Sequence, residues 1–121
     1  MQRLMSIARA LDNESRLRIL LSLRSGELCL CQLIELLGAA PSTVSRHVEL
    51  LRRAGLVEMR KEGRWHYYRL AGKNAPAVVR EAIRWVARAL GDDEQVLADA
   101  ARLAGVRATG PEEWTACYTR N

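Results

Sequence analysis

Apolar residues recur along most of the chain at three- and four-residue spacings, the period of an α-helix with one buried face. The pattern predicts a short first helix over residues 7–11 and a second helix that Asp12 or Asn13 caps and Ser25-Gly26 ends. Apolar positions lie on nearly every side of the second helix, so we expect it at the centre of the core. These positions are Leu17, Ile19, Leu20, Leu21 and Leu23.

Two further helices are predicted between residues 28 and 54, joined by a short turn. The first covers residues 28–37, and Gly38 fits the position just past its end. The second begins at Pro41, which suits a first helical turn, and Gly55 ends it. Its inward residues are Val44, Val48 and Leu51, so its outer face is polar and basic.

After Gly55 the period changes to two, which is typical of β-strands. Residues 56–60 and 65–70 form the predicted strands, and Glu62-Gly63 predicts the hairpin turn between them. An isolated hairpin is marginally stable, so we expect it to pack on the helices. Helices over 77–90 and 93–104 follow. We predict one domain over residues 1–105 and a C-terminal tail over 106–121.

The charge of the chain is concentrated in one block. The 121 residues carry a formal net charge of +5, and residues 41–70, with seven basic and three acidic side chains, account for +4 of it. A local basic surplus is typical of a protein that binds a polyanion such as nucleic acid. A solvated charged face would give the same count, so charge alone does not decide between the two.

The order helix, turn, basic helix and basic hairpin predicts a winged helix-turn-helix, a mainly α fold with a β-hairpin wing (α+β). The second helix of such a pair enters the major groove of DNA, and its side chains bind bases or phosphates. Among the polar residues of this second helix, His47 can equally bind phosphate or pack under the wing. The predicted DNA-binding residues are Ser42, Thr43, Ser45, Arg46, His47, Arg52, Arg53, Lys61 and Arg64.

Recognition of two half-sites normally requires two subunits, so we expect a homodimer on a pseudo-palindromic operator. The first helix and the helix over 77–90 carry apolar stripes that the trihelical core does not need. These stripes are the expected dimer surfaces, although they could instead pack within one monomer.

Three cysteines are the candidate chemistry. Cys29 and Cys31 stand one residue apart in ELCLCQL, just ahead of the predicted DNA-reading helix, and Cys117 is the third. The sequence has neither a run approaching a membrane span nor a secretory signal pattern, so we expect a cytoplasmic protein without membrane contact. Cytoplasmic cysteines are more often core residues, redox pairs or soft-metal ligands than structural disulfides. A CxC pair with no oriented base and no Gly-rich phosphate loop gives no support to an enzyme.

The segments ELCLCQL, STVSRHVELLRRAGLV and EGRWHYYRL together resemble the ArsR/SmtB family of bacterial metal-sensing repressors over about residues 3–90. The resemblance implies a homodimeric winged helix that leaves its operator when a metal or metalloid binds. It also implies that Cys29 and Cys31 correspond to the first two thiols of an arsenic-binding ELCVCDL motif. As(III) or Sb(III) is then the expected inducer, with no organic cofactor.

The sequence departs from that motif at two positions. Ile34 stands where a third cysteine often occurs, and Gln32 replaces an aspartate. A three-thiolate site would therefore need Cys117, from the same subunit or its partner. The helix over 77–90 lacks the Asp and His pairs of the zinc sensors, and no cysteine precedes Cys29 as in the cadmium and lead sensors.

We expect the ligand to distort the first turn of the helix over 28–37, because positions i and i+2 lie about 200° apart around a regular helix. That distortion would shift the DNA-reading helix. Two alternatives keep the fold: a thiol-based redox or sulfur-species-sensing repressor, and an architectural DNA-binding protein without an effector.

Overall fold

The computed structural model describes residues 1–108, so Cys117 and most of the predicted tail lie outside the described residues. The elements run in the order α1 (Gln2–Leu11), α2 (Glu14–Ser22), the 3₁₀ helix η1 (Leu23–Ser25), β1 (Leu28–Cys29), α3 (Leu30–Leu37), α4 (Pro41–Arg53), β2 (Val57–Glu62), β3 (Trp65–Leu70), α5 (Ala77–Ala89) and α6 (Glu94–Ala108). This order confirms the predicted mainly α fold with a wing. Within residues 1–108, no helix is long and apolar enough to cross a membrane.

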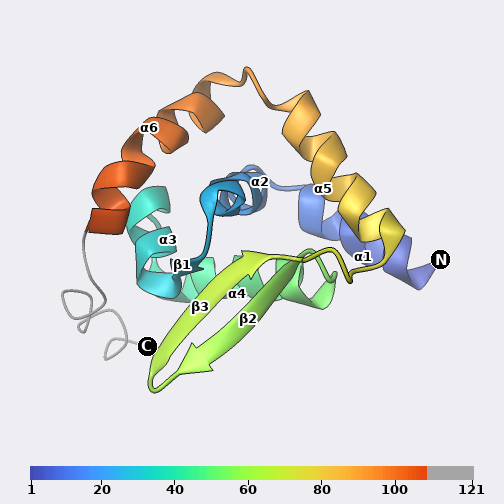
Figure 1. Cartoon of the computed structure of the whole chain (residues 1–121), viewed down its shortest axis with the longest axis horizontal. Helices are drawn as coiled ribbons and strands as arrows, with labels where there is room; N and C mark the ends of the chain where they lie inside the picture. The colour runs from blue at the N-terminus through green and yellow to red at the C-terminus, as the bar shows by residue number, and fades with distance from the viewer. Residues whose placement is uncertain (109–121) are drawn as a thin grey trace.

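Helix α2 lies at the centre, as its nearly continuous apolar surface predicts. Ile19 and Leu20 are fully buried, and α2 packs against α4, α5 and α6. In Figure 1, α5 and α6 arch over α2. The Asn13 side chain caps the helix by accepting a hydrogen bond from the backbone N–H of Arg16 at 3.1 Å.

Helices α3 and α4 form the predicted helix-turn-helix. Gly38 ends α3 in the left-handed conformation with φ 66°, which a residue without Cβ adopts at little cost. Pro41 opens α4, whose residues Val44, Val48 and Leu51 are buried in the core. Burial of this apolar stripe fixes α4 by one face and leaves its polar face to solvent.

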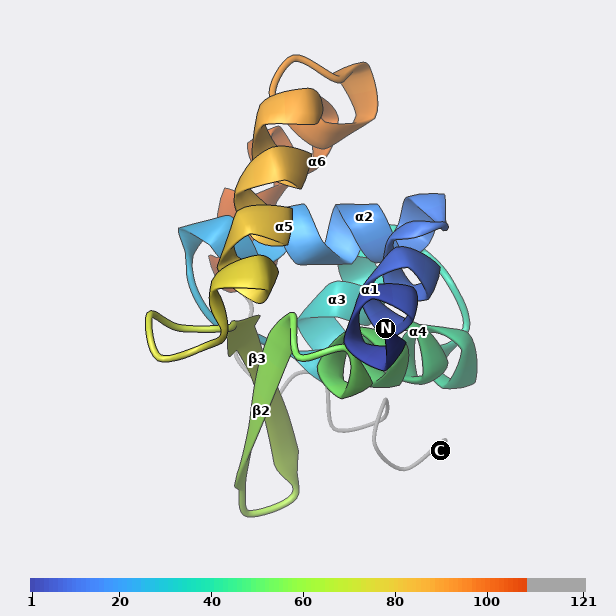
Figure 2. The same cartoon turned by 90° about the vertical axis from the view of Figure 1, so that its right-hand side faces the viewer.

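Strands β2 and β3 form the wing, which projects away from the helices in Figure 2. Glu62 pairs with Trp65, so the two-residue turn is Gly63-Arg64, one position later than the predicted Glu62-Gly63. Gly63 has φ 62°, and glycine at the first position of a two-residue turn suits the right-handed twist of the strands.

The predicted start of the helix over residues 28–37 is wrong. Leu28 and Cys29 form the strand β1, which pairs with β3 in a sheet of order β1-β3-β2, and α3 begins only at Leu30. A two-residue strand is too short to leave a period in the sequence. Its conformation is decided by backbone hydrogen bonding to a strand almost forty residues later.

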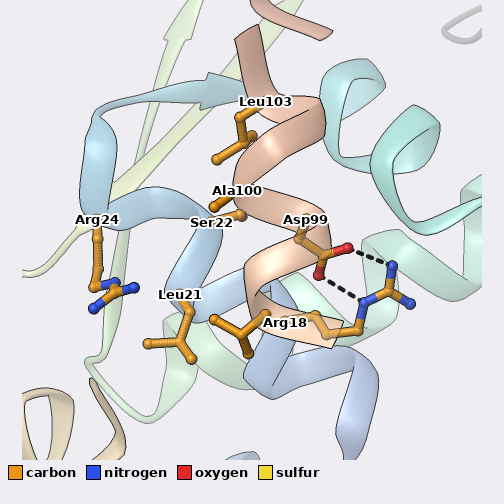
Figure 3. Close-up of a pocket in the computed structure, with 8 residues that line it drawn as sticks. Arg18, Leu21, Ser22, Arg24, Asp99, Ala100 and Leu103 are labelled. Atoms are coloured by element: carbon orange, nitrogen blue, oxygen red, sulfur yellow. Dashed lines mark hydrogen bonds and ion pairs between the residues drawn. The ribbon is translucent and has the colours of Figure 1, made fainter. Parts of the chain in front are cut away.

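Helix α6 extends four residues beyond the predicted end at 104 and packs against α2 and α3. Asp99 is 3% exposed and accepts two hydrogen bonds from the Arg18 guanidinium of α2, at 2.9 and 3.0 Å (Figure 3). Arg102 donates to the backbone oxygen of Leu36 near the end of α3 at 2.9 Å. Charged side chains therefore dock α6 against α2 and the end of α3.

Replacing Asp99 with asparagine should destabilise the protein, because the Arg18 guanidinium would lose its counter-charge. Removing one partner of a buried pair costs about 3–5 kcal/mol, and water reaches part of Arg18, so we expect about 2–3 kcal/mol. Urea unfolding measures the change, with Glu94→Gln on the exposed first turn of α6 as the control. A difference below about 1 kcal/mol between the two variants, the range of exposed pairs, would contradict this docking role.

Candidate nucleic-acid interface and thiol site

The first two turns of α4 present the polar side chains predicted to meet DNA. Ser42, Ser45 and Arg46 are exposed, and Thr43 is half-buried. The buried stripe of the helix faces the opposite way, so these residues share an outward face near the N-terminal end of α4. Hydroxyls and a guanidinium in this place can donate to phosphates and to base edges.

Arg52 and Arg53, near the end of α4, share one acidic partner. Arg52 lies 2.6 Å from a carboxylate oxygen of Glu49, and Arg53 lies 3.2 Å from the same oxygen. The hydrogen bond from Arg52 lowers the pKa of the Glu49 carboxyl, so Glu49 is ionised at neutral pH. Both arginines are exposed, but the Glu49 carboxylate offsets part of the positive charge with which they could bind phosphate.

The tip of the wing is basic and exposed, as predicted. Lys61 and Arg64 are both exposed and flank the turn at Gly63. The Arg64 guanidinium lies 5.0 Å from the centroid of the Trp65 ring, a cation–π contact that orients the arginine along the wing. Contact of this tip with DNA remains a prediction.

His47 faces a neighbour in α2 that the sequence did not reveal. Its Nδ1 lies 3.1 Å from one guanidinium nitrogen of Arg16. The other two nitrogens of this guanidinium donate to the backbone oxygens of Arg9 and Ala10 at the end of α1. Burial lowers the pKa of His47, and the charges of Arg16 and Arg46 lower it further. A neutral imidazole can accept the Arg16 hydrogen bond, so Arg16 ties the end of α1 to α4.

The two thiols of ELCLCQL lie at the junction of β1 and α3. Cys29 and Cys31 are 0% and 1% exposed, and they are not joined in a disulfide. Cys29 has an extended backbone and caps α3: its N–H donates to the Gln32 side chain at 2.9 Å, and its side chain accepts from the Gln32 N–H. The predicted distortion rested on both thiols lying in one regular helix, but Cys29 belongs to β1 and only Cys31 lies in α3.

This junction supplies two donors for a soft ion. Thiolates are the ligands that thiophilic ions prefer, so Cys29 and Cys31 fit that chemistry. Within residues 1–108, no group of three Cys, His, Asp or Glu side chains is placed to hold a metal ion. Cys117, the remaining cysteine, lies outside the described residues. Burial of both thiols means that a ligand can enter only when the junction opens locally.

Comparison with known proteins places these features in a family. Residues 13–59 match the model of the bacterial regulatory proteins of the arsR family. The chain is 37% identical over 102 residues to the arsenic resistance transcriptional regulator ArsR1 of Pseudomonas putida, covering 83% of this chain and 77% of that protein. It is 47% identical over 62 residues to the arsenical resistance operon repressor of Escherichia coli, covering 50% and 53% of the two chains.

Solved structures give the same result for the fold. HlyU from Vibrio cholerae matches with a TM-score of 0.63 and 32% identity, over 75% of this chain and 95% of that chain. A homodimeric winged helix-turn-helix DNA-binding domain of Mb0332 from Mycobacterium bovis, described as a possible ArsR-family regulator, matches with a TM-score of 0.61 and 33% identity. That match covers 81% of this chain and 80% of the other.

Acidification should destabilise the protein through His47. The pKa of His47 is lowered from its ordinary value of 6.5, so the unfolded chain takes up a proton at a higher pH than the folded chain. The contribution of neutral His47 to the free energy of unfolding is therefore fully present above the pKa that His47 has in the unfolded chain. It is lost as pH falls through the pKa that His47 has in the folded chain. Between about pH 7.5 and 5.5, we expect His47→Gln to lose less unfolding free energy than wild type, by about 0.5 kcal/mol after solvent screening.

Urea titrations at the two pH values measure this difference. His66→Gln, which removes the wing histidine, is the reference variant. An equal change of the pH response in both variants would contradict the assignment to His47.

Proposed function

Because the chain belongs to the arsR family of bacterial regulatory proteins, we propose that it is a repressor that releases its operator when As(III) or Sb(III) binds its cysteine thiolates. The fold and the family make it a transcriptional regulator rather than an enzyme. The observation that carries the proposal is the position of Cys29 and Cys31. They occupy the junction between the wing sheet and the helix-turn-helix, where a bound ion moves both DNA-contacting elements.

The proposed complex is a homodimer on double-stranded operator DNA in the cytoplasm. Apolar side chains of α1 and α5 support the dimer: Leu4 and Trp85 are each 61% exposed, and Met5 is 58% exposed. A groove of about 410 Å³ lies between α1, α2 and α5, and Leu11 and Leu17 line it together with Trp85. Two α4 helices related by a two-fold axis read two half-sites, so the operator is a pseudo-palindrome.

When the metalloid binds, thiolates replace the hydroxide ligands of the arsenic. Arsenous acid and two thiols give a dithiolate As–OH and two molecules of water, and a third thiol gives a trithiolate and one more water. Cys29 and Cys31 supply the first two sulfurs, and Cys117 is the candidate third. The new As–S bonds draw both sulfurs to one centre, and because Cys29 lies in β1 and Cys31 in α3, we expect β1 to move against α3.

A second function fits the same thiols. In a redox-sensing repressor, peroxide would oxidise two thiols to a disulfide and be reduced to two molecules of water. One of the solved structures similar to this chain is of reduced HlyU from Vibrio cholerae, with 33% identity and a TM-score of 0.60, which keeps this alternative open. Neighbouring CxC thiols are poorly spaced for an unstrained disulfide, so Cys117 would be the expected partner.

Removing the Arg46 side chain should weaken operator binding, because this exposed guanidinium stands near the N-terminal end of α4. We expect Arg46→Ala to lower the affinity about 10–100-fold for a duplex selected from a random pool, and less for random DNA. Fluorescence anisotropy at one fixed salt concentration measures both affinities. Arg24→Ala, at an exposed arginine on η1, is the control; equal losses in the two variants would contradict a role of α4 in recognition.

Arsenite should weaken operator binding by wild type, and the loss should require both thiols of ELCLCQL. We expect a fall of about 5–150-fold, the range of a typical coupling free energy. Cys29→Ser and Cys31→Ser should abolish the fall, with circular dichroism confirming that both variants fold. Cys117→Ser should reduce it if Cys117 is a ligand. Zn(II) and peroxide are the comparison inputs; a response to peroxide with none to arsenite would favour the redox function instead.

A further inference from the structure

The segment just before the two thiols is held from both sides by arginines. From α6, Arg107 donates to the backbone oxygen of Glu27 at 2.7 Å, to that of Gly26 at 3.1 Å and to the Ser25 hydroxyl at 3.0 Å. From the wing, Arg60 donates two hydrogen bonds to the Glu27 carboxylate, at 2.9 and 2.8 Å. Glu27 therefore joins the wing to α6 two residues before Cys29.

Cys29 also lies in one row of the sheet with Arg60 of the wing. Cys29 of β1 pairs with Tyr67 of β3, and Tyr67 pairs with Arg60 of β2, so the three residues form one row across the sheet. Residues paired in this way point to the same face of a sheet. The Arg60 guanidinium lies 4.4 Å from the centroid of the Tyr67 ring, which completes the row from thiol to wing.

We propose that Glu27 is a positioning residue that couples the occupancy of the Cys29 thiol to the orientation of the wing, through its paired hydrogen bonds to Arg60. This inference rests on the proposed function and adds a route to DNA that does not pass through α4. Lys61 follows Arg60 directly, so any change at Arg60 reaches the basic tip of the wing within one residue.

The physical reason is that Cys29 cannot move alone. Its N–H is bonded to the Gln32 side chain at 2.9 Å, and its backbone belongs to the sheet. A ligand that draws its sulfur toward Cys31 therefore displaces β1 and the preceding Glu27. A carboxylate that accepts two hydrogen bonds from one guanidinium fixes direction as well as distance, so Arg60 follows.

The Glu27–Arg60 pair suits an orienting role because it contributes little to folding. The two side chains are 29% and 50% exposed, and ion pairs at such exposure are worth little to the free energy of unfolding. The pair orients Arg60 through its geometry, since the guanidinium donates two hydrogen bonds to one carboxylate at 2.9 and 2.8 Å. Its loss should therefore leave a folded protein whose wing no longer follows the thiol site.

The test compares Glu27→Gln with Glu58→Gln in the full chain. Glu58 is the matched control, because it pairs with Arg69 at 2.9 Å on the same hairpin, whereas Glu27 pairs with Arg60. Operator affinity is measured at fixed salt with and without arsenite, and the ratio of the two affinities is the coupling. Arsenite affinity without DNA is measured by the ultraviolet absorbance of the As–S bonds.

We expect Glu27→Gln to reduce the coupling at least about five-fold, with arsenite affinity no lower than that of wild type, because both thiols remain and only the link between sites is lost. Glu58→Gln should keep the wild-type coupling. A purely structural role would lower arsenite affinity and leave the coupling per bound ion unchanged. Unchanged coupling in Glu27→Gln, or an equal loss in Glu58→Gln, overturns the proposal.

A second measurement separates this inference from the proposed function. If wild-type operator affinity ignores arsenite, the proposed function is wrong, and the link from Glu27 to Cys29 is then tested without ligand or DNA. Iodoacetamide labelling of Cys29, located by peptide mapping, should be several-fold faster in both Glu27→Gln and Arg60→Gln than in wild type or Glu58→Gln. Equal labelling rates in all four proteins overturn the link itself.

Discussion

The pairing of β1 with β3 is the interaction on which the DNA-binding surface depends. The helix-turn-helix and the wing are separate in sequence, and this two-residue strand joins the start of α3 to the middle of the hairpin. Because Leu28 is fully buried beneath the sheet, the strand is fixed by core packing as well as by its hydrogen bonds. One short stretch of backbone, which also carries Cys29, thus ties the wing to the start of the helix-turn-helix.

Arginine side chains add a second level of organisation around that strand. Arg18, Arg102 and Arg107 link α6 to α2, to the end of α3 and to the segment before β1. All three arginines donate to backbone oxygens, which would otherwise need water or a helix partner. Such contacts fix direction without requiring a large apolar area, so α6 can brace the thiol junction while most of its residues remain exposed.

Burial of the thiols explains how a small ion could have a large effect. A thiol pair on the surface could bind a metalloid with little change around it. Cys29 and Cys31 instead lie in the core, and Cys29 shares a capping box with Gln32. Under the proposed function, bringing both sulfurs to one ion would change the local fold, and ion binding and DNA affinity would then be linked by a reciprocal coupling free energy.

The sequence by itself determined the central α2, the helix-turn-helix, the hairpin and the polar face of α4, because each follows from a local period or a turn residue. It also identified the thiols as candidate ligands, although not that Cys29 lies in a strand and caps α3. Only the tertiary structure decided that Leu28 and Cys29 form β1, that Arg16 binds His47, and that Glu27 joins Arg60 to Arg107. These contacts span between 31 and 80 residues of chain or depend on a strand that has no period of its own, so no local pattern encodes them.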